Sequence, residues 1–346
     1  MPPIASPSRR AVAAWLLACC ALVFAMVVVG GITRLTHSGL SIVEWQPIVG
    51  AVPPLDDAQW EEAFAKYRAT PEFRLRNADM TLAGFKGIFW WEYVHRLLGR
   101  VIGLVFLVPF AWFVYRRAIT GSLAWKLGAV FVLGGLQGAL GWYMVKSGLV
   151  DDPRVSSVRL AAHLGMAFVI YGVMFWIALG LMNPVRLPAS DSARRRAGAL
   201  VAIVFVMVLS GALVAAIRAG LAYNTWPLMN GHWVPPEILA VEPWWRNFLD
   251  NMATVQFMHR TIAVLVVLVT LIVWARVQRE PPNARARGWS HVLLAAALAQ
   301  ASVGVATLIN QVPLLLAALH QAGAVVVFTC ALGVRHALRQ APQLHR

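Results

Sequence analysis

The sequence predicts an all-α integral membrane protein with eight transmembrane helices, forming two tandem four-helix bundles related by a pseudo-twofold axis along the membrane normal. Two observations support this fold class. The chain of 346 residues is 59% hydrophobic and only 13% charged, and its apolar residues occur in runs rather than in a periodic scatter. The second half of the chain also repeats motifs of the first half in the same order, which indicates a duplicated unit.

Each predicted helix corresponds to one apolar run of about 20 residues or more, the length that crosses the hydrocarbon core of a bilayer. The runs cover residues 11–33, 88–115, 123–145, 158–182, 197–217, 252–274, 289–309 and 313–334. Four runs fall in an N-terminal half, residues 1–183, and four in a C-terminal half, residues 184–346. Because each half has an even number of spans, the two copies should share one orientation in the membrane.

The distribution of charge predicts that orientation. Arginines such as those at 194–196 gather in the connections on the side of the N-terminus, where Asp191 and Glu280 are the only acids. The positive-inside rule then places both termini in the cytoplasm. We expect the inner (plasma) membrane of a bacterium, with the mitochondrial inner membrane as the less favoured alternative.

Two classes of function are disfavoured by composition. The pI near 10.9 could suggest nucleic acid, but the basic residues lie in short loops between apolar runs and not on one folded face, so we expect no nucleic-acid partner. Cys19, Cys20 and Cys330 lie inside apolar runs, which leaves neither a disulfide framework nor a C-x-x-C metal site. Redox chemistry in this chain would therefore require a bound cofactor.

Two long connections, residues 34–87 and 218–251, are rich in Trp, Pro and Gly, and both are predicted on the outer side, where such loops commonly cover a site. In the first, Asp56 is a candidate helix cap and Pro71 a candidate stop. Between them, helical spacing relates Trp60, Ala63, Phe64 and Tyr67. This pattern predicts a short amphipathic helix resting on lipid headgroups, with contact to a substrate as the alternative.

The repeat aligns several polar residues of the two halves. Residues 92–96 (EYVHR) match 256–260 (QFMHR) with a shift of 164, and His163 matches His320. Gln137 and Gly141 match Gln300 and Gly304, and the Gly-Leu, Trp and Pro-Pro features of the first outer connection recur in the second.

Four histidines lie inside predicted spans, where an ionisable or metal-binding side chain is costly and therefore a functional candidate. They are His95, His163, His259 and His320. All four lie near the outer ends of their spans, so the two of each half can provide both axial ligands of one heme iron. The alternative for each is a polar contact between helices, and a zinc site is disfavoured because no half offers a third well-placed ligand.

Arg96 and Arg260 directly follow two of these histidines. They are possible partners of heme propionates, and snorkelling to the membrane surface is the alternative.

Glu92 distinguishes the two halves. It stands one helical turn before His95, whereas the repeat places the neutral Gln256 at the equivalent position. An electron-transferring heme needs no adjacent carboxylate, but a site that moves protons or stabilises positive charge does. We therefore predict chemistry in the first half and electron transfer in the second. A structural pairing of Glu92 with Arg96 or Arg100 is the alternative.

These motifs, together with the glycine-rich segment 30–41 and the Trp-Pro loops, resemble the heme A synthase family over nearly the whole chain. Without a cysteine pair in the outer loops, the chain looks like the proteobacterial and mitochondrial branch. The resemblance implies an oxidoreductase that converts the methyl group at porphyrin position 8 of heme O to the formyl group of heme A, for terminal oxidases. For the mechanism, we predict water as the oxygen source and electron transfer through a bound heme b.

The resemblance also implies roles for individual residues and partners. His259 and His320 would bind heme b, while His95 and His163 would hold the substrate heme, with catalytic Glu92 near the reacting carbon. A heme O synthase and cytochrome oxidase assembly factors are the implied protein partners. A homo-oligomer is also considered, although the sequence does not determine the oligomeric state. Two other functions remain open: a diheme cytochrome carrying electrons between quinol and an outer acceptor, and a transporter or heme-handling assembly factor.

Overall fold

The computed structural model describes residues 7–46, 49–150, 152–185 and 187–339. Within these ranges all regular secondary structure is helical, as predicted. Eight helices are long and apolar enough to cross a membrane, which confirms the predicted spans. They are α1 (Pro7–Leu35), α4 (Leu82–Tyr115), α5 (Gly121–Lys146), α6 (Ser157–Met182), α7 (Asp191–Ala216), α9 (Met252–Gln278), α10 (Ala284–Ile309) and α11 (Leu314–Ala337).

Several helices extend beyond their apolar runs because polar residues cap them. Thr81 accepts a hydrogen bond from the backbone N–H of Gly84, so α4 begins at Leu82 and not at 88. Ser190 caps α7 by accepting from the N–H of Ala193. The Ser190 N–H and hydroxyl in turn donate to the buried carboxylate of Glu280. Such caps satisfy backbone donors that have no partner within the helix, and these polar turns lengthen the helices past the hydrocarbon core.

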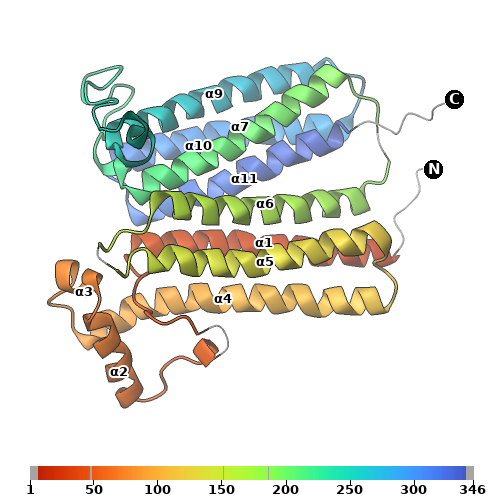
Figure 1. The fold of residues 1–346 in the computed structure, drawn as a ribbon. Helices are drawn as coiled ribbons and strands as arrows, with labels where there is room; N and C mark the ends of the chain where they lie inside the picture. Colours follow the sequence, from red (N-terminus) through yellow and green to blue (C-terminus); the bar gives the residue numbers. More distant parts are fainter. Residues whose placement is uncertain (1–6, 47–48, 151, 186, 340–346) are drawn as a thin grey trace.

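The long helices lie side by side, with both long connections at one end and the first residue of α1 and the last of α11 at the other (Figure 1). In the N-terminal half, α1 and α5 each contact α4 and α6; in the C-terminal half, α7 and α10 each contact α9 and α11. The halves meet where α1 and α6 contact α11 and where α6 contacts α7. The pseudo-twofold relation of two tandem bundles stays a prediction.

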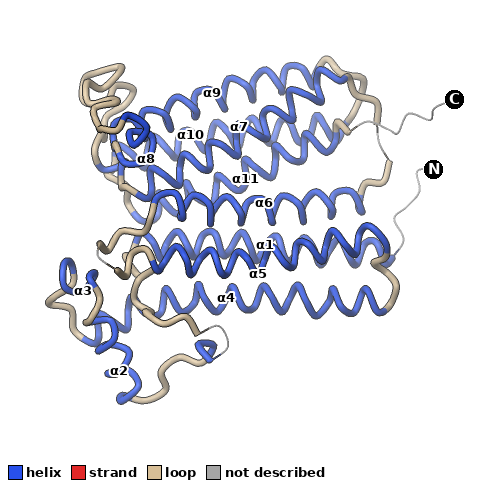
Figure 2. The backbone as a smooth tube through the Cα atoms, in the orientation of Figure 1, coloured by secondary structure: helices blue, strands red, loops and turns tan. Residues whose placement is uncertain are grey.

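The long connections contain the short helices. The first holds η1 (Val49–Ala51), α2 (Asp57–Arg68) and α3 (Pro71–Arg76), and the second holds η2 (Ala219–Leu221), η3 (Trp244–Arg246) and α8 (Asn247–Asp250). At the opposite end of the molecule the connections are short loops (Figure 2). Regular structure outside the spans is thus concentrated at one end.

The predicted amphipathic helix is α2, but its predicted environment was wrong. Asp56 caps it by accepting from the N–H of Gln59, as expected. Its apolar face does not rest on headgroups: Trp60 and Tyr67 are buried against Phe85 and Phe89 near the start of α4. The early start of α4 creates this apolar surface, so protein rather than lipid covers the stripe. Pro71, predicted as a stop, also occupies the first turn of α3.

Large apolar side chains cover the outside of the spans. Leu104 and Val108 on α4, Trp125 and Val132 on α5 and Leu268 on α9 are all exposed. Contiguous apolar exposure of this extent requires a lipid environment. The protein is therefore a multi-pass membrane protein.

Candidate functional site

The four span histidines lie two in each half. His259 on α9 and His320 on α11 have ring centroids 6.4 Å apart and ring planes inclined by 74°. His95 lies on α4 and His163 on α6. The structure thus brings the predicted second-half pair together, and the first-half pairing stays a prediction.

The spacing of the His259 and His320 rings fits one metal ion between them. An imidazole nitrogen binds a first-row metal ion at about 2 Å, and two such bonds plus the half-widths of two rings span roughly the observed separation. No group of three or more His, Cys, Asp or Glu residues suited to a metal occurs in the described parts of the chain. Two opposed imidazoles without a third ligand suit the axial positions of a heme iron.

Each histidine faces a glycine on a neighbouring helix of its own half. A Cβ atom built on Gly30 would lie 2.9 Å from Nε2 of His95, and one on Gly211 would lie 3.3 Å from Cε1 of His259. The same construction places Cβ atoms on Gly141 and Gly304 at 2.8 and 2.7 Å from Cε1 of His163 and His320, respectively. Real Cβ atoms do not approach this closely in three of the four cases, so the glycines provide the space that the rings occupy.

Two glutamines hold the backbone beside the α6 and α11 histidines. The side-chain amide of Gln137 donates to the carbonyl of His163 at 2.9 Å, and that of Gln300 donates to the carbonyl of His320 at 2.7 Å. The Gln300 amide nitrogen also lies 3.2 Å from Nδ1 of His320, whereas Nδ1 of His163 has no hydrogen-bonding partner in the described structure. Both halves therefore have a glutamine bound to the histidine carbonyl, but only His320 also has a polar neighbour at Nδ1 of its ring.

Glu92 anchors the first outer connection to α4. One carboxylate oxygen accepts from the Ser41 hydroxyl and from the Ile42 N–H, both at 2.8 Å. The other accepts from Nη2 and Nε of Arg96 at 2.7 and 3.1 Å. The residue is 2% exposed. Four donors thus surround a buried carboxylate one turn from His95, and the pairing with Arg96 considered from the sequence is present.

Gln256 makes the equivalent connection in the second half. Its amide donates to the carbonyl of Ala219 at 2.8 Å, and its oxygen accepts from Arg260 at 3.1 Å. Arg260 also donates to the carbonyls of Tyr223 and Thr225. Both halves therefore fasten an outer connection to the helix that carries a histidine.

Arg96 and Arg260 use most of their donors in these anchors. Arg96 donates to the carbonyls of Ile42 and Glu44 in addition to Glu92. Nε of Arg260 is buried without a partner among the described residues. The predicted role of both arginines as propionate partners stays a prediction, and the contacts present are to backbone and to Glu92 or Gln256.

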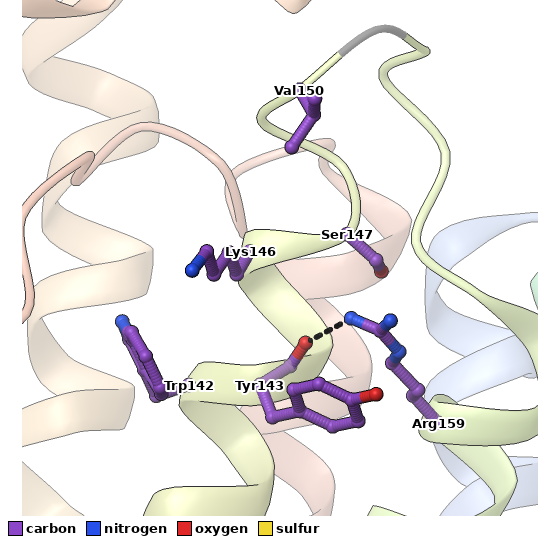
Figure 3. Close-up of a pocket in the computed structure, with 6 residues that line it drawn as sticks. All are labelled: Trp142, Tyr143, Lys146, Ser147, Val150 and Arg159. Carbon is purple, nitrogen blue, oxygen red and sulfur yellow. Dashed lines mark hydrogen bonds between the residues drawn. The ribbon is translucent and has the colours of Figure 1, made fainter.

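A pocket of about 550 Å³ opens where α5 ends and α6 begins (Figure 3). Arg159 donates to the carbonyl of Tyr143 at 2.8 Å and lies over the Tyr143 ring, while Lys146 lies over the Trp142 ring. Trp142 also stacks on Trp45 of the first outer connection at 5.1 Å. None of the four span histidines lines this pocket. Cations over aromatic rings at a helix end are typical of a membrane–water interface.

Sequence reasoning identified the histidines but not the residues that shape their surroundings. Gly141, Gly304, Gln137 and Gln300 appeared in the repeat without a role. Ser210 on α7, whose hydroxyl oxygen lies 3.2 Å from Nδ1 of His259, was missed. Aligning Gly30 with Gly211, the glycines that precede the two long connections, would have set Ser210 opposite Val29 of the first half. Their functions depend on contacts between helices, which an internal repeat alone does not reveal.

The fold and site define a class: a multi-pass helical membrane protein with two half-buried histidines in the spans of each half. The chain belongs to the COX15-CtaA family, described as cytochrome oxidase assembly protein, whose pattern it matches over residues 13–332. This confirms the resemblance seen in the sequence.

Bacterial relatives named heme A synthase match over nearly their full length. The protein of Nitrosospira multiformis is 56% identical over 336 residues, covering 96% of this chain and 94% of the relative. The protein of Nitrosomonas eutropha is 54% identical, and the match covers 93% of this chain and 92% of the relative. The protein of Rhodospirillum centenum is 48% identical, and the match covers 98% of this chain and 92% of the relative.

Proposed function

We propose that the protein is a heme A synthase, an oxidoreductase that converts heme O to heme A by oxidising the methyl group at porphyrin position 8 to a formyl group. The supporting observation is two half-buried span histidines in each half, with a buried carboxylate one helical turn from His95 and a neutral amide one turn from His259, in a chain of this family. A simple electron carrier would have no use for this asymmetry.

We assign the second half to a resident heme b, held by His259 and His320, and the first half to the substrate, held by His95 and His163. The close spacing of the His259 and His320 rings supports this assignment. When bound, heme b would supply an acceptor for single electrons.

The chain's own part in the oxidation falls to Glu92. Replacing a methyl group by a formyl group with oxygen from water releases four electrons and four protons, so positive charge develops near the porphyrin edge. Each oxygen of Glu92 already accepts two hydrogen bonds, which leaves little room to accept a proton. Of the two roles considered, the geometry favours a fixed carboxylate that stabilises positive charge over a general base.

The proposed orientation in the membrane follows from the distribution of charge and from the position of the two long connections. Both connections lie at one end of the helices (Figure 1), and the arginine-rich short connections lie at the other, so we place both termini in the cytoplasm of a bacterium. A heme O synthase would supply the substrate, and cytochrome oxidase assembly factors would receive the product. A homo-oligomer is compatible with the apolar outer surface.

The decisive experiment measures pigment. The protein is expressed with and without a heme O source, purified, and its hemes are extracted and separated by chromatography. We expect heme A only when heme O is supplied. A diheme cytochrome that carries electrons between quinol and an outer acceptor would yield unchanged heme in both preparations, and that result would reject the proposal.

The role of Glu92 is tested by Glu92→Gln, with Ser41→Ala as the matched control. Both variants remove a hydrogen bond between the first outer connection and α4, but only the first removes the charge. We expect Glu92→Gln to retain bound heme and to lose heme A formation by at least tenfold, while Ser41→Ala loses much less. Equal losses in both variants would assign Glu92 to anchoring alone.

The assignment of the two hemes is tested by His259→Ala and His95→Ala, purified without heme O. We expect only His259→Ala to lose heme b. Loss of heme b in His95→Ala, with retention in His259→Ala, would reverse the assignment.

A further inference from the structure

A buried serine touches one of the two histidines assigned to the resident heme. Ser210 lies on α7 and is 6% exposed. Its hydroxyl oxygen lies 3.2 Å from Nδ1 of His259 on α9. A hydroxyl can donate or accept a hydrogen bond, so the contact is compatible with either tautomer of the ring. Only one of these tautomers leaves Nε2 free to bind iron.

The His259 ring presents its Nδ1 edge to α7. A Cβ built on Gly211 would approach Cε1 at 3.3 Å and Nδ1 at 3.9 Å. The Nδ1 edge therefore faces α7, where the Ser210 hydroxyl lies. With Nδ1 against α7, Nε2 is the nitrogen available to the space between His259 and His320.

The equivalent histidine of the first half is oriented differently. A Cβ built on Gly30 of α1 would approach Nε2 of His95 at 2.9 Å and Cδ2 at 3.2 Å. The Nε2 edge thus faces α1. In the described part of the chain the His95 ring has no hydrogen-bonding partner. Binding iron through Nε2 would require this ring to turn.

The internal repeat shows which residues differ beside the two histidines, His95 and His259. Gly30 and Gly211 occupy equivalent positions, 181 residues apart, as do Gly39 and Gly220. The residue before Gly211 is Ser210, and the residue before Gly30 is Val29. A valine side chain offers no donor or acceptor, so the first half lacks the group that could hold its α4 histidine in place.

We propose that Ser210 is a positioning residue that holds His259 ready to bind iron, and that Val29 leaves His95 free to exchange its heme. The Ser210 oxygen accepts the proton of Nδ1–H, which fixes the tautomer and leaves the lone pair of Nε2 for the metal. The second half then retains its heme, while the first half releases product. This inference rests on the proposed function, since it adopts the same assignment of resident and exchangeable sites.

The hydrogen bond has a consequence for the metal as well as for the ring. An imidazole whose Nδ1–H is hydrogen-bonded is a more basic ligand. A more basic ligand stabilises the ferric state over the ferrous state and lowers the reduction potential. Removal of the Ser210 oxygen should therefore raise the reduction potential of the resident heme. If the substitution only loosened the packing and left the ligand unchanged, no such rise in potential would be expected.

The test uses full-length protein in detergent carrying heme b, in the wild type and in Ser210→Ala and Ser210→Thr. Loss of heme to apomyoglobin and the midpoint potential are both measured. Removing such a partner typically weakens metal binding by about 10- to 100-fold, so we expect Ser210→Ala to lose heme at least about tenfold faster, at a raised potential. Ser210→Thr, which keeps the hydroxyl, should restore both properties.

The reciprocal variant is Val29→Thr, which adds a hydroxyl with little change of shape. Protein loaded with heme O is mixed with apomyoglobin, and we expect first-half heme to leave about tenfold more slowly. Unchanged heme loss and potential in Ser210→Ala would overturn the proposal, as would Ser210→Thr behaving like Ser210→Ala. Neither readout requires heme A formation, so failure of the proposed function would appear separately, as absence of heme A in the wild type.

Discussion

The guanidinium of Arg218 lies 2.9 Å from Nδ1 of His37, and the two residues are 181 positions apart in the chain. This is the interval that relates Gly30 to Gly211. Both residues follow the first helix of their half, and both have a left-handed backbone with φ of 56°. Equivalent points of the two halves therefore touch each other at the end of the molecule that carries the two long connections.

This contact should depend on pH. Burial, followed by the charges of Arg218, Arg76 and Arg34, lowers the pKa of His37 to about 4 from 6.5. Because the folded pKa lies below the unfolded value, the contribution of His37 to stability is present above pH 6.5 and is lost as pH falls through 4. We expect His37→Gln, which cannot titrate, to show a smaller decrease in melting temperature between pH 6.5 and 4. Identical pH profiles in detergent would contradict this expectation.

Glu72 on α3 should have the opposite pH dependence. Its side chain is 2% exposed, and one carboxylate oxygen has no hydrogen-bonding partner in the described ranges. Burial raises the pKa of Glu72 to about 7 from 4.5, reinforced by Glu92 and opposed by Arg76 and Arg218. A raised pKa favours the protonated folded form, so its stabilisation is complete below pH 4.5 and lost as pH rises through 7.

Glu72→Gln should remove this dependence. A shift of this size corresponds to roughly 3 kcal/mol, so the variant should gain melting temperature relative to the wild type as pH rises from 4.5 to 8. Thermal unfolding of both proteins across this range is the measurement. A constant difference between them would show that Glu72 does not titrate in this interval.

Gly304→Ala should disturb His320. The added Cβ would lie 2.7 Å from Cε1 of that ring, whereas a Cβ on Gly288 of the same helix would meet nothing within 4 Å. Overpacking of this kind typically costs about 1–3 kcal/mol. We expect purified Gly304→Ala to contain less heme b per protein than the wild type, while Gly288→Ala retains the wild-type content. Equal heme content in the two variants would show that the space beside His320 is not limiting.

Trp60→Ala tests whether α2 rests on α4. The Trp60 ring is 8% exposed and lies 4.9 Å from that of Phe89, so truncation should destabilise the protein by about 3–5 kcal/mol. Trp125→Ala on α5 is the control, because that ring is 83% exposed. Melting temperatures in detergent compare the two variants. A similar small decrease in both would indicate that α2 contributes little to the fold.

The apolar runs determined the eight spans, because a helix that crosses lipid must be apolar for its length and must satisfy its own backbone hydrogen bonds. The repeat predicted the histidine pairs for a related reason, since equivalent residues of a duplicated unit lie at equivalent depths. The helices of the structure differ from the predicted spans only at their ends, because capping residues such as Thr81 extend a helix into polar sequence.

The tertiary structure decided what surrounds the histidines. The sequence identified Glu92 as the difference between the halves, but Glu92 and Gln256 both bind an arginine and an outer connection. The contact of Ser210 with His259 adds a second difference. Ring orientation, the space left by glycines and the partners of each imidazole depend on how neighbouring helices pack. The length of an apolar run determines that a helix is embedded in the membrane, but it does not determine which side chain of the next helix that helix contacts.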